Sequence, residues 1–255
     1  MHKKHIYFFI VILVVLFTTV NSADRPLIGI TSIFQATEAD PVGKVRTNMS
    51  YVNAVLESGG LPVVLPPVKS EEAIAGYVAD LDGLVLVGGM DIPPRIYGEK
   101  AHETVDSLTT ERFWFESRLI KSWLISEKPV LGVCLGCQFT NVMSGGTMIQ
   151  DIPSEVGKKV VHRKEGGASH LIELEKSTRL YSILGVDTLT VNSYHHQAVD
   201  KIGDNLRITA HTQDGIVEGL EFPGERFGLF VQWHPERMPQ EHRQKIFGAF
   251  VKACK

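Results

Sequence analysis

Short apolar runs alternate with longer amphipathic segments in the first half of the chain. Four runs have the length of buried strands in a parallel sheet, at residues 26–31, 61–65, 83–87 and 129–133. Apolar residues at helical spacing predict helices at residues 51–58, 71–77 and 111–126, and another after residue 134. Residues 32–46 and 94–109 are polar and are expected to be irregular. Strands that alternate with helices in this way indicate βαβ units and a mostly parallel sheet with helices on both faces.

The pattern changes after Gly145-Gly146, where shorter apolar segments follow one another. They predict strands at residues 147–150, 159–162, 170–175, 189–191, 206–210, 216–222 and 227–231. We expect antiparallel additions to the sheet, one or two more core strands, and a closing helix at residues 239–254. No linker separates the two halves, so residues 24–255 are interpreted as one domain.

The first 23 residues have the layout of a secretory signal peptide. A short basic segment precedes an unbroken apolar run of twelve residues at 6–17, and small residues follow at 20–23. The run is shorter than the ~18 residues expected of a membrane span. Cleavage after Ser22 or Ala23 would yield an exported protein, periplasmic or secreted, with no stable membrane association. The alternative is an uncleaved N-terminal anchor.

The amino-acid composition is that of an ordinary globular protein and adds few further constraints on function. Of 255 residues, 44% are hydrophobic and 22% are charged, and the formal net charge of −3 leaves no basic footprint for nucleic acid. The three cysteines, Cys134, Cys137 and Cys254, make no disulfide framework. A disulfide between Cys134 and Cys137 is sterically feasible, but the favoured interpretation is that Cys137 packs as a small apolar residue.

The segment 128–138 reads as a buried strand, a sharp turn at Cys134 and the start of a helix. Cysteine here takes the place of serine in the Gly-x-Ser-x-Gly elbow of hydrolases, which exposes the nucleophile at the end of a strand. The following helix N-terminus favours a thiolate. We therefore interpret Cys134 as a covalent nucleophile rather than a small core cysteine.

The segment 230–236 supplies a candidate base. His234 follows a strand, and Glu236 is placed to reach back to its imidazole and orient it. Donors for an oxyanion are the backbone N–H of Leu135 and one from Gly88-Gly89. Taken alone, His234 could be a histidine at a strand end whose ring forms hydrogen bonds only with the backbone. Gly88-Gly89 could likewise form a simple tight turn.

The segment 192–197 is a further polar cluster and contains two adjacent histidines. A metal site is not expected, because neighbours on a strand point to opposite faces and no cysteine or carboxylate lies at ligand spacing. Substrate contact is the favoured interpretation, and an exposed loop is the alternative. His162 and His170 are expected at the surface.

Together these segments resemble the class I glutamine amidotransferase-like superfamily and, more narrowly, the bacterial γ-glutamyl-γ-aminobutyrate hydrolase family. The matching stretches run in the family's order, at residues 26–31, 51–67, 82–99, 128–152, 191–199, 214–221 and 227–236. Within them, GGMDIPPRIYGE and NSYHHQAV are typical of the hydrolase branch.

The resemblance implies a flavodoxin-like α/β fold and a cysteine hydrolase without cofactor or metal that cleaves γ-glutamyl amides through a thioester. It implies a catalytic triad of Cys134, His234 and Glu236. It implies oxyanion donors at Gly89 and Leu135, and substrate contacts from Gln138, Ser193, Tyr194 and His195. The expected partner is a small γ-glutamyl compound, and a homodimer is left open.

Two positions depart from the family pattern. The family usually carries arginine directly after the nucleophile, where this chain has Leu135, and aspartate at the position of Phe113. Both changes bear on the substrate and leave the triad intact. The alternatives are a folate-type poly-γ-glutamate hydrolase, a glutamine amidotransferase subunit, and a ligand-binding protein without catalysis.

Overall fold

The computed structural model describes residues 25–255. The expected signal peptide therefore lies outside the described residues. Within those residues, no helix combines the length and the apolar character that a membrane span requires.

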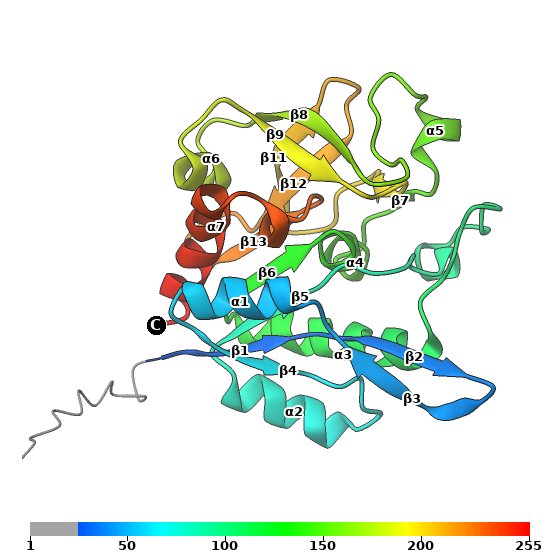
Figure 1. The fold of residues 1–255 in the computed structure, drawn as a ribbon, viewed down its shortest axis with the longest axis vertical. Coiled ribbons are helices and arrows are strands. Elements are labelled where there is room, and N and C mark those ends of the chain that lie inside the picture. The colour runs from blue at the N-terminus through cyan, green and yellow to red at the C-terminus, as the bar shows by residue number, and fades with distance from the viewer. Residues whose placement is uncertain (1–24) are drawn as a thin grey trace, which may run out of the picture.

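An eleven-stranded sheet runs through the molecule (Figure 1). Five neighbouring strands pair in parallel in the order β4-β1-β5-β6-β13. Their bounds are β1 Leu27–Ile30, β4 Leu61–Val64, β5 Gly83–Leu86, β6 Val130–Val133 and β13 Gly228–Val231. The parallel sheet predicted from the apolar runs is confirmed, and the carboxyl ends of these strands share one edge.

The sheet continues from β13 with antiparallel strands in the order β12-β11-β8-β9. Their bounds are β8 Ala168–Leu174, β9 Thr188–Ser193, β11 Arg207–Thr212 and β12 Val217–Glu221. Two short strands, β7 Met148–Ile149 and β10 Ala198–Val199, pair beside β12. The antiparallel additions expected from the second half of the sequence are thus present.

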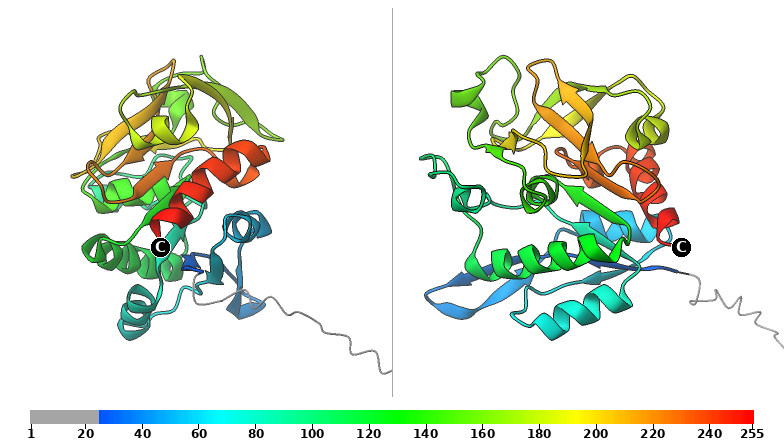
Figure 2. Two further views of the ribbon diagram at one scale, coloured as in Figure 1. Left: turned by 90° about the vertical axis from the view of Figure 1, so that its left-hand side faces the viewer. Right: turned by 180° about the vertical axis from the view of Figure 1, so that it is seen from behind.

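Helices cover both faces of the sheet, as Figure 2 shows with α7 in red on one side and α3 in green on the other. One apolar core lies beneath α1, α6 and α7, and the other beneath α2, α3 and α4. The helices are α1 Met49–Glu57, α2 Glu71–Asp80, α3 Thr110–Ser126, α4 Leu135–Met143, α5 Ile152–Glu155, α6 Arg179–Leu184 and α7 Gln240–Ala253. Residues 25–255 also contain two 3-10 helices, η2 Pro94–Tyr97 and η3 Pro235–Arg237.

Two expectations about secondary structure were wrong. Residues 32–46 are not irregular but form a hairpin of β2 Ile33–Thr37 and β3 Asp40–Arg46, which projects from the main sheet. Most of its side chains are exposed, so the sequence shows no apolar alternation there. Residues 159–162 are not a strand but belong to an irregular connection between α5 and β8.

Candidate active site

Cys134 lies at the carboxyl end of β6, directly before α4. Its backbone has φ 53° and ψ −107°, a left-handed turn that non-glycine residues rarely adopt. The glycines on either side allow this turn. A Cβ on Gly132 would lie 2.7 Å from the Phe230 ring, and one on Gly136 would collide with the Leu86 carbonyl oxygen. The elbow predicted from the sequence is therefore present.

Two adjoining cavities open beside the thiol, of about 260 and about 230 Å³. Cys134, Gly89 and Tyr194 line both of them. The thiol is less open than a simple exposed elbow implies, because Cys134 is only 8% exposed. Access to its sulfur is through these cavities.

His234 follows β13 and lines the second cavity together with Cys134. Its Nδ1 lies 2.8 Å from the Glu236 carboxylate, which is itself buried. The Asn192 side chain holds the His234 backbone through two hydrogen bonds. Asn192 Oδ1 accepts from the His234 N–H at 2.9 Å, and Asn192 Nδ2 donates to the His234 carbonyl oxygen at 2.9 Å. Nucleophile, imidazole and carboxylate are thus brought together in one buried arrangement.

The charges around His234 keep it protonated. Burial alone would lower its pKa, but hydrogen bonding and charge interactions with Cys134 and Glu236 outweigh burial and raise the pKa to about 10. Tyr51 lies 3.4 Å from the same Nδ1, and burial together with the Glu236 charge raises the pKa of its phenol, which stays neutral. An imidazolium beside a thiol is the arrangement that activates a cysteine nucleophile.

The loop after β5 is held so that one backbone donor stays available. Tyr51 Oη accepts from the Gly88 N–H at 3.2 Å, and Arg112 Nη2 donates to the carbonyls of Val87 and Gly88 at 3.2 Å. Neither the Gly89 N–H nor the Leu135 N–H bonds to another residue within 25–255. The two expected oxyanion donors therefore remain unpaired at the cavity that Gly89 and Cys134 line.

Arg112 is nearly inaccessible, and its guanidinium forms an ion pair with Glu116 at 2.9 Å. Burial raises the pKa of the Glu116 carboxyl, while Arg112 opposes that rise. A Cβ on Gly89 would collide with the Arg112 guanidinium. The ion pair therefore lies directly beneath the loop that carries the Gly89 donor.

Three of the four predicted substrate contacts line the first cavity: Gln138, Tyr194 and His195. The prediction for Ser193 was wrong, because this residue is fully buried at the end of β9 and its hydroxyl donates to the His162 carbonyl oxygen at 2.5 Å. Residues alternate between the two faces of a strand, and Ser193 faces away from the cavity.

The expectation that His162 and His170 lie at the surface was also wrong. They are 4% and 8% exposed, and together with His195 they surround the buried carboxylate of Glu218. Cys137 is buried in α4, and burial raises the pKa of its thiol well above the ordinary value. Cys134 and Cys137 are both free thiols in the structure.

Sequence reasoning missed the positioning roles of several residues, above all Tyr51, Asn192 and Arg112. Tyr51 and Arg112 occur on predicted helices, where an apolar or charged residue at helical spacing gives no sign of a distant partner. Asn192 directly precedes the Ser193–His196 segment, and its polar amide at a strand end was the one available signal.

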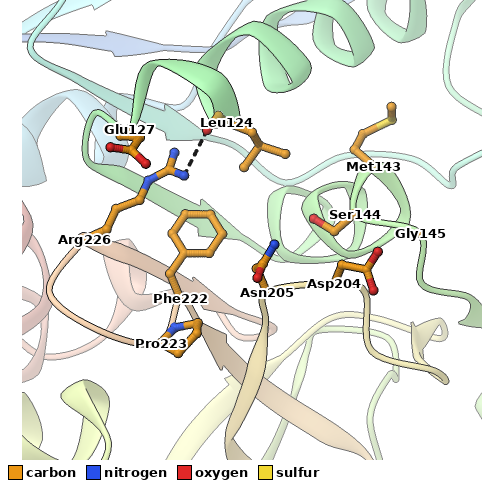
Figure 3. Close-up of a pocket in the computed structure, with 10 residues that line it drawn as sticks. All are labelled: Leu124, Glu127, Met143, Ser144, Gly145, Asp204, Asn205, Phe222, Pro223 and Arg226. Carbon is orange, nitrogen blue, oxygen red and sulfur yellow. Dashed lines mark hydrogen bonds between the residues drawn. The ribbon is translucent and has the colours of Figure 1, made fainter.

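A larger cavity of about 740 Å³ lies at the opposite edge of the sheet, near the start of β6 (Figure 3). Glu127, Asn205 and Arg226 line it, and Arg226 donates to the Leu124 carbonyl oxygen at 2.9 Å. None of the predicted site residues lines this cavity. The predicted site residues therefore gather at the two smaller cavities rather than at this larger one.

The sequence profile of the family described as Peptidase C26 matches residues 26–236. The chain belongs to the peptidase C26 family. Its fold is that of the class I glutamine amidotransferase-like proteins. The glutaminase domain of Trypanosoma brucei CTPS, solved with bound acivicin, superimposes with a TM-score of 0.60 at 16% identity, covering 90% of this chain and 93% of that one. At that identity the likeness concerns the fold alone.

Relatives of this peptidase C26 member carry different names. Protein NtpR of Enterococcus hirae is 38% identical over 237 residues, which cover 89% of this chain and 98% of the relative. A provisionally named glutamine amidotransferase of Mycobacterium tuberculosis is 35% identical over 91% of this chain and 76% of its own. The γ-glutamyl-γ-aminobutyrate hydrolase of Escherichia coli K12 is 27% identical over 92% of this chain and 95% of its own.

Proposed function

We propose that this protein hydrolyses the γ-amide bond of small γ-glutamyl compounds through a thioester on Cys134. The observation that carries the proposal is the buried arrangement of Cys134, His234 and Glu236 beside the free N–H groups of Gly89 and Leu135. Such an arrangement has each part that acyl transfer from a cysteine requires.

The reaction uses the Cys134 sulfur as the nucleophile and His234 as the group that transfers protons. The Cys134 thiolate attacks the γ-carbonyl carbon, and the carbonyl electron pair moves to oxygen, where the N–H groups of Gly89 and Leu135 donate to it. As the tetrahedral centre collapses, the C–N bond breaks and the His234 imidazolium gives its proton to the departing amine. Neutral His234 then removes a proton from water as the water attacks the thioester. Glutamate leaves, and the thiolate–imidazolium pair is restored.

The charges that line the first cavity support a γ-glutamyl group as the acyl half. Such a group carries a free α-ammonium and a free α-carboxylate. The cavity offers the Arg163 guanidinium for the carboxylate and the Asp106 carboxylate for the ammonium, while Asp91 is paired with His196 at 3.2 Å. The cavity of about 260 Å³ is also small for a ligand pocket, which favours compact γ-glutamyl compounds over folyl-polyglutamates.

The two departures from the family pattern are compatible with this proposal. Leu135 is 1% exposed, so its side chain packs in the core while its backbone N–H stays available. Phe113 stacks on Phe139 with ring centroids 5.7 Å apart, which fills the position with apolar contact. Glutamine is itself a γ-glutamyl amide, so the hydrolase and amidotransferase names of the relatives describe one class of acyl donor.

The decisive experiment is a panel of γ-glutamyl compounds assayed for release of glutamate. It should contain glutamine, γ-glutamyl-aminobutyrate, γ-glutamyl dipeptides and a folyl-polyglutamate. We expect turnover of at least one small member, loss of that turnover in Cys134→Ala, and a γ-glutamyl adduct on Cys134 by mass spectrometry after acid quench. Cys254→Ala removes a thiol remote from the cavities and should retain the activity.

Absence of Cys134-dependent turnover across the panel would refute the proposal. Turnover of the folyl-polyglutamate alone would replace it with the folate-type alternative. Binding without a trapped adduct, unchanged in Cys134→Ser, would instead indicate a ligand-binding protein.

A further inference from the structure

Three histidines and one glutamate converge at a buried point behind the reaction cavity. They come from four separate segments: the connection before β8, β8 itself, the loop after β9, and β12. We call them the histidine cluster, which consists of His162, His170, His195 and Glu218. One ligand atom from each residue lies within 4.8 Å of all the others, and Glu218 is completely inaccessible.

Three imidazole nitrogens of the histidine cluster approach Glu218 Oε1, but none of these contacts is aligned as a hydrogen bond. Neither carboxylate oxygen of Glu218 bonds to any residue in 25–255, and the nitrogens that face it on His162 and His195 are likewise unpartnered. A buried carboxylate that imidazole nitrogens approach at 3.1 to 3.5 Å without an aligned hydrogen bond is incompletely satisfied. A ligand at this point would satisfy these atoms.

Outer contacts determine which imidazole nitrogens carry protons. His195 Nδ1 lies 2.9 Å from the Gln197 carbonyl oxygen, so it must be the N–H donor, and His162 Nε2 lies 3.2 Å from the Asp214 carboxylate. In neutral rings the opposite nitrogens then present lone pairs toward Glu218. Imidazoles oriented by carboxylate and carbonyl acceptors are the usual outer arrangement of a metal site.

The distances suit a small tetrahedral ion. Glu218 Oε1 lies 3.5 Å from His162 Nδ1, 3.1 Å from His170 Nε2 and 3.3 Å from His195 Nε2. A zinc ion with bonds of about 2.0 to 2.1 Å to nitrogen and oxygen has ligand–ligand edges of about 3.3 to 3.4 Å. All four ligand atoms already lie within 4.8 Å of one another, so an ion can enter with small shifts of the side chains.

We propose that the histidine cluster binds one divalent transition-metal ion, zinc by preference, as a closed structural site. Three imidazoles and one carboxylate are ligands for zinc and similar ions, whereas calcium and magnesium prefer oxygen alone. Four protein ligands complete a tetrahedron and leave no position for substrate, so the ion stabilises the fold rather than acting on the substrate.

The site is connected to the reaction cavity through one loop. His195 lines that cavity, and the Gln197 carbonyl oxygen that accepts from His195 also accepts from Gln138 Nε2 at 3.1 Å. An ion on His195 would therefore hold the loop that carries Tyr194 and His195 against α4. This gives the fully buried cluster a role in the shape of the substrate pocket.

The test is the metal content and melting behaviour of tag-free protein purified without chelator. By plasma mass spectrometry we expect about one zinc per chain, and a lower melting temperature after 1,10-phenanthroline that zinc restores and magnesium does not. Glu218→Gln should lose the metal and the response to chelator. Asp214→Asn, which changes the outer partner of His162 and leaves the four ligands in place, should weaken zinc affinity by about 10- to 100-fold.

His211→Ala is the matched control, because His211 also lies beside two glutamates but is partly exposed. It should keep full metal content and the response to chelator. The inference is overturned if wild-type protein dialysed against zinc retains none and melts independently of chelator, or if Glu218→Gln keeps its zinc. Should Glu218→Gln not fold, Asp214→Asn and the wild-type chelator experiment decide. None of these measurements uses glutamate release, so they succeed or fail independently of the proposed reaction.

Discussion

At the scale of single residues, the site depends on the strained backbone of Cys134. A non-glycine residue in such a conformation costs about 1 to 3 kcal/mol and persists only where its surroundings impose it. Here the Cys134 N–H donates to the Val231 carbonyl oxygen at 2.8 Å, and its own carbonyl accepts from Cys137 and Gln138 at the start of α4. Strand pairing and helix initiation together hold the thiol at the cavity.

The protonation of His234 is a second feature at the scale of single residues. Its pKa in the folded protein, about 10, is above the ordinary value of 6.5. A raised pKa means that the protonated form stabilises the folded state. That contribution is complete below about pH 6.5 and is lost as the pH rises through about 10.

We expect the NMR titration of His234 in the wild type to have its midpoint near pH 10. In Glu236→Gln and in Cys134→Ala the midpoint should fall, because each change removes a group that favours the imidazolium. Glu236→Gln should also reduce kcat by about 10²- to 10⁴-fold. A midpoint near 6.5 in the wild type, unchanged in both variants, would contradict the imidazolium assignment.

At the scale of elements, α3 supports the loop after β5, which carries the proposed oxyanion donor Gly89. The buried Arg112–Glu116 pair lies one helical turn apart on α3, and Arg112 donates to the carbonyls of Val87 and Gly88. Arg112 is thus a positioning residue that acts on the Gly89 N–H through the loop.

Arg112→Met should lower the free energy of unfolding by about 3 to 5 kcal/mol, because it leaves the Glu116 charge buried and unpaired. It should also reduce kcat by about 10-fold or more with little change in KM, because a misplaced donor affects the transition state most. Denaturant unfolding and steady-state kinetics measure these two effects. Arg112→Met combined with Glu116→Leu should recover part of the stability and none of the kcat.

Arg118→Met is the control on the same helix. Arg118 pairs with Glu71 in an exposed position, so its loss should cost about 1 kcal/mol or less and leave kcat unchanged. Equal losses of stability and activity in the two single variants would show that Arg112 acts only through the stability of α3.

At the scale of the whole molecule, the antiparallel half of the sheet curls back over the edge of the sheet at which Cys134 lies. Three strands separate β9 from β13 in the sheet order, yet Asn192 in β9 makes two hydrogen bonds with His234 after β13. The same curl brings His195 after β9 against Glu218 in β12. His234, the loop that carries His195 and the histidine cluster are therefore brought together by one bend of the sheet.

The cellular location of the protein is a separate prediction. The basic, apolar and small-residue segments at 1–23 predict export and cleavage after Ser22 or Ala23. Fractionation of cells that make the natural protein should place it outside the cytoplasm. Its intact mass should correspond to a chain that begins at Ala23 or Asp24. A full-length mass in the membrane fraction would indicate the uncleaved anchor, and one in the cytosol would refute export.

Much of the fold was predictable because its pattern is local. Strands buried on both faces read as apolar runs, and α3 and α7 agree with their predicted bounds to within one or two residues. The hairpin at 32–46 was missed because it projects from the sheet and lacks a buried face. Ser193 was misplaced because one step along a strand exchanges the cavity side for the core side.

By itself, the sequence determined the βαβ half of the sheet and the elbow at Cys134, because apolar periodicity and paired glycines act over a few residues. Its candidate base and carboxylate, His234 and Glu236, were also local, two positions apart. The tertiary structure alone decided that Asn192 holds His234, that Arg112 lies beneath Gly89, and that distant histidines surround Glu218. These contacts depend on how the sheet curls and how helices pack on it, and residue spacing along the chain does not record that geometry.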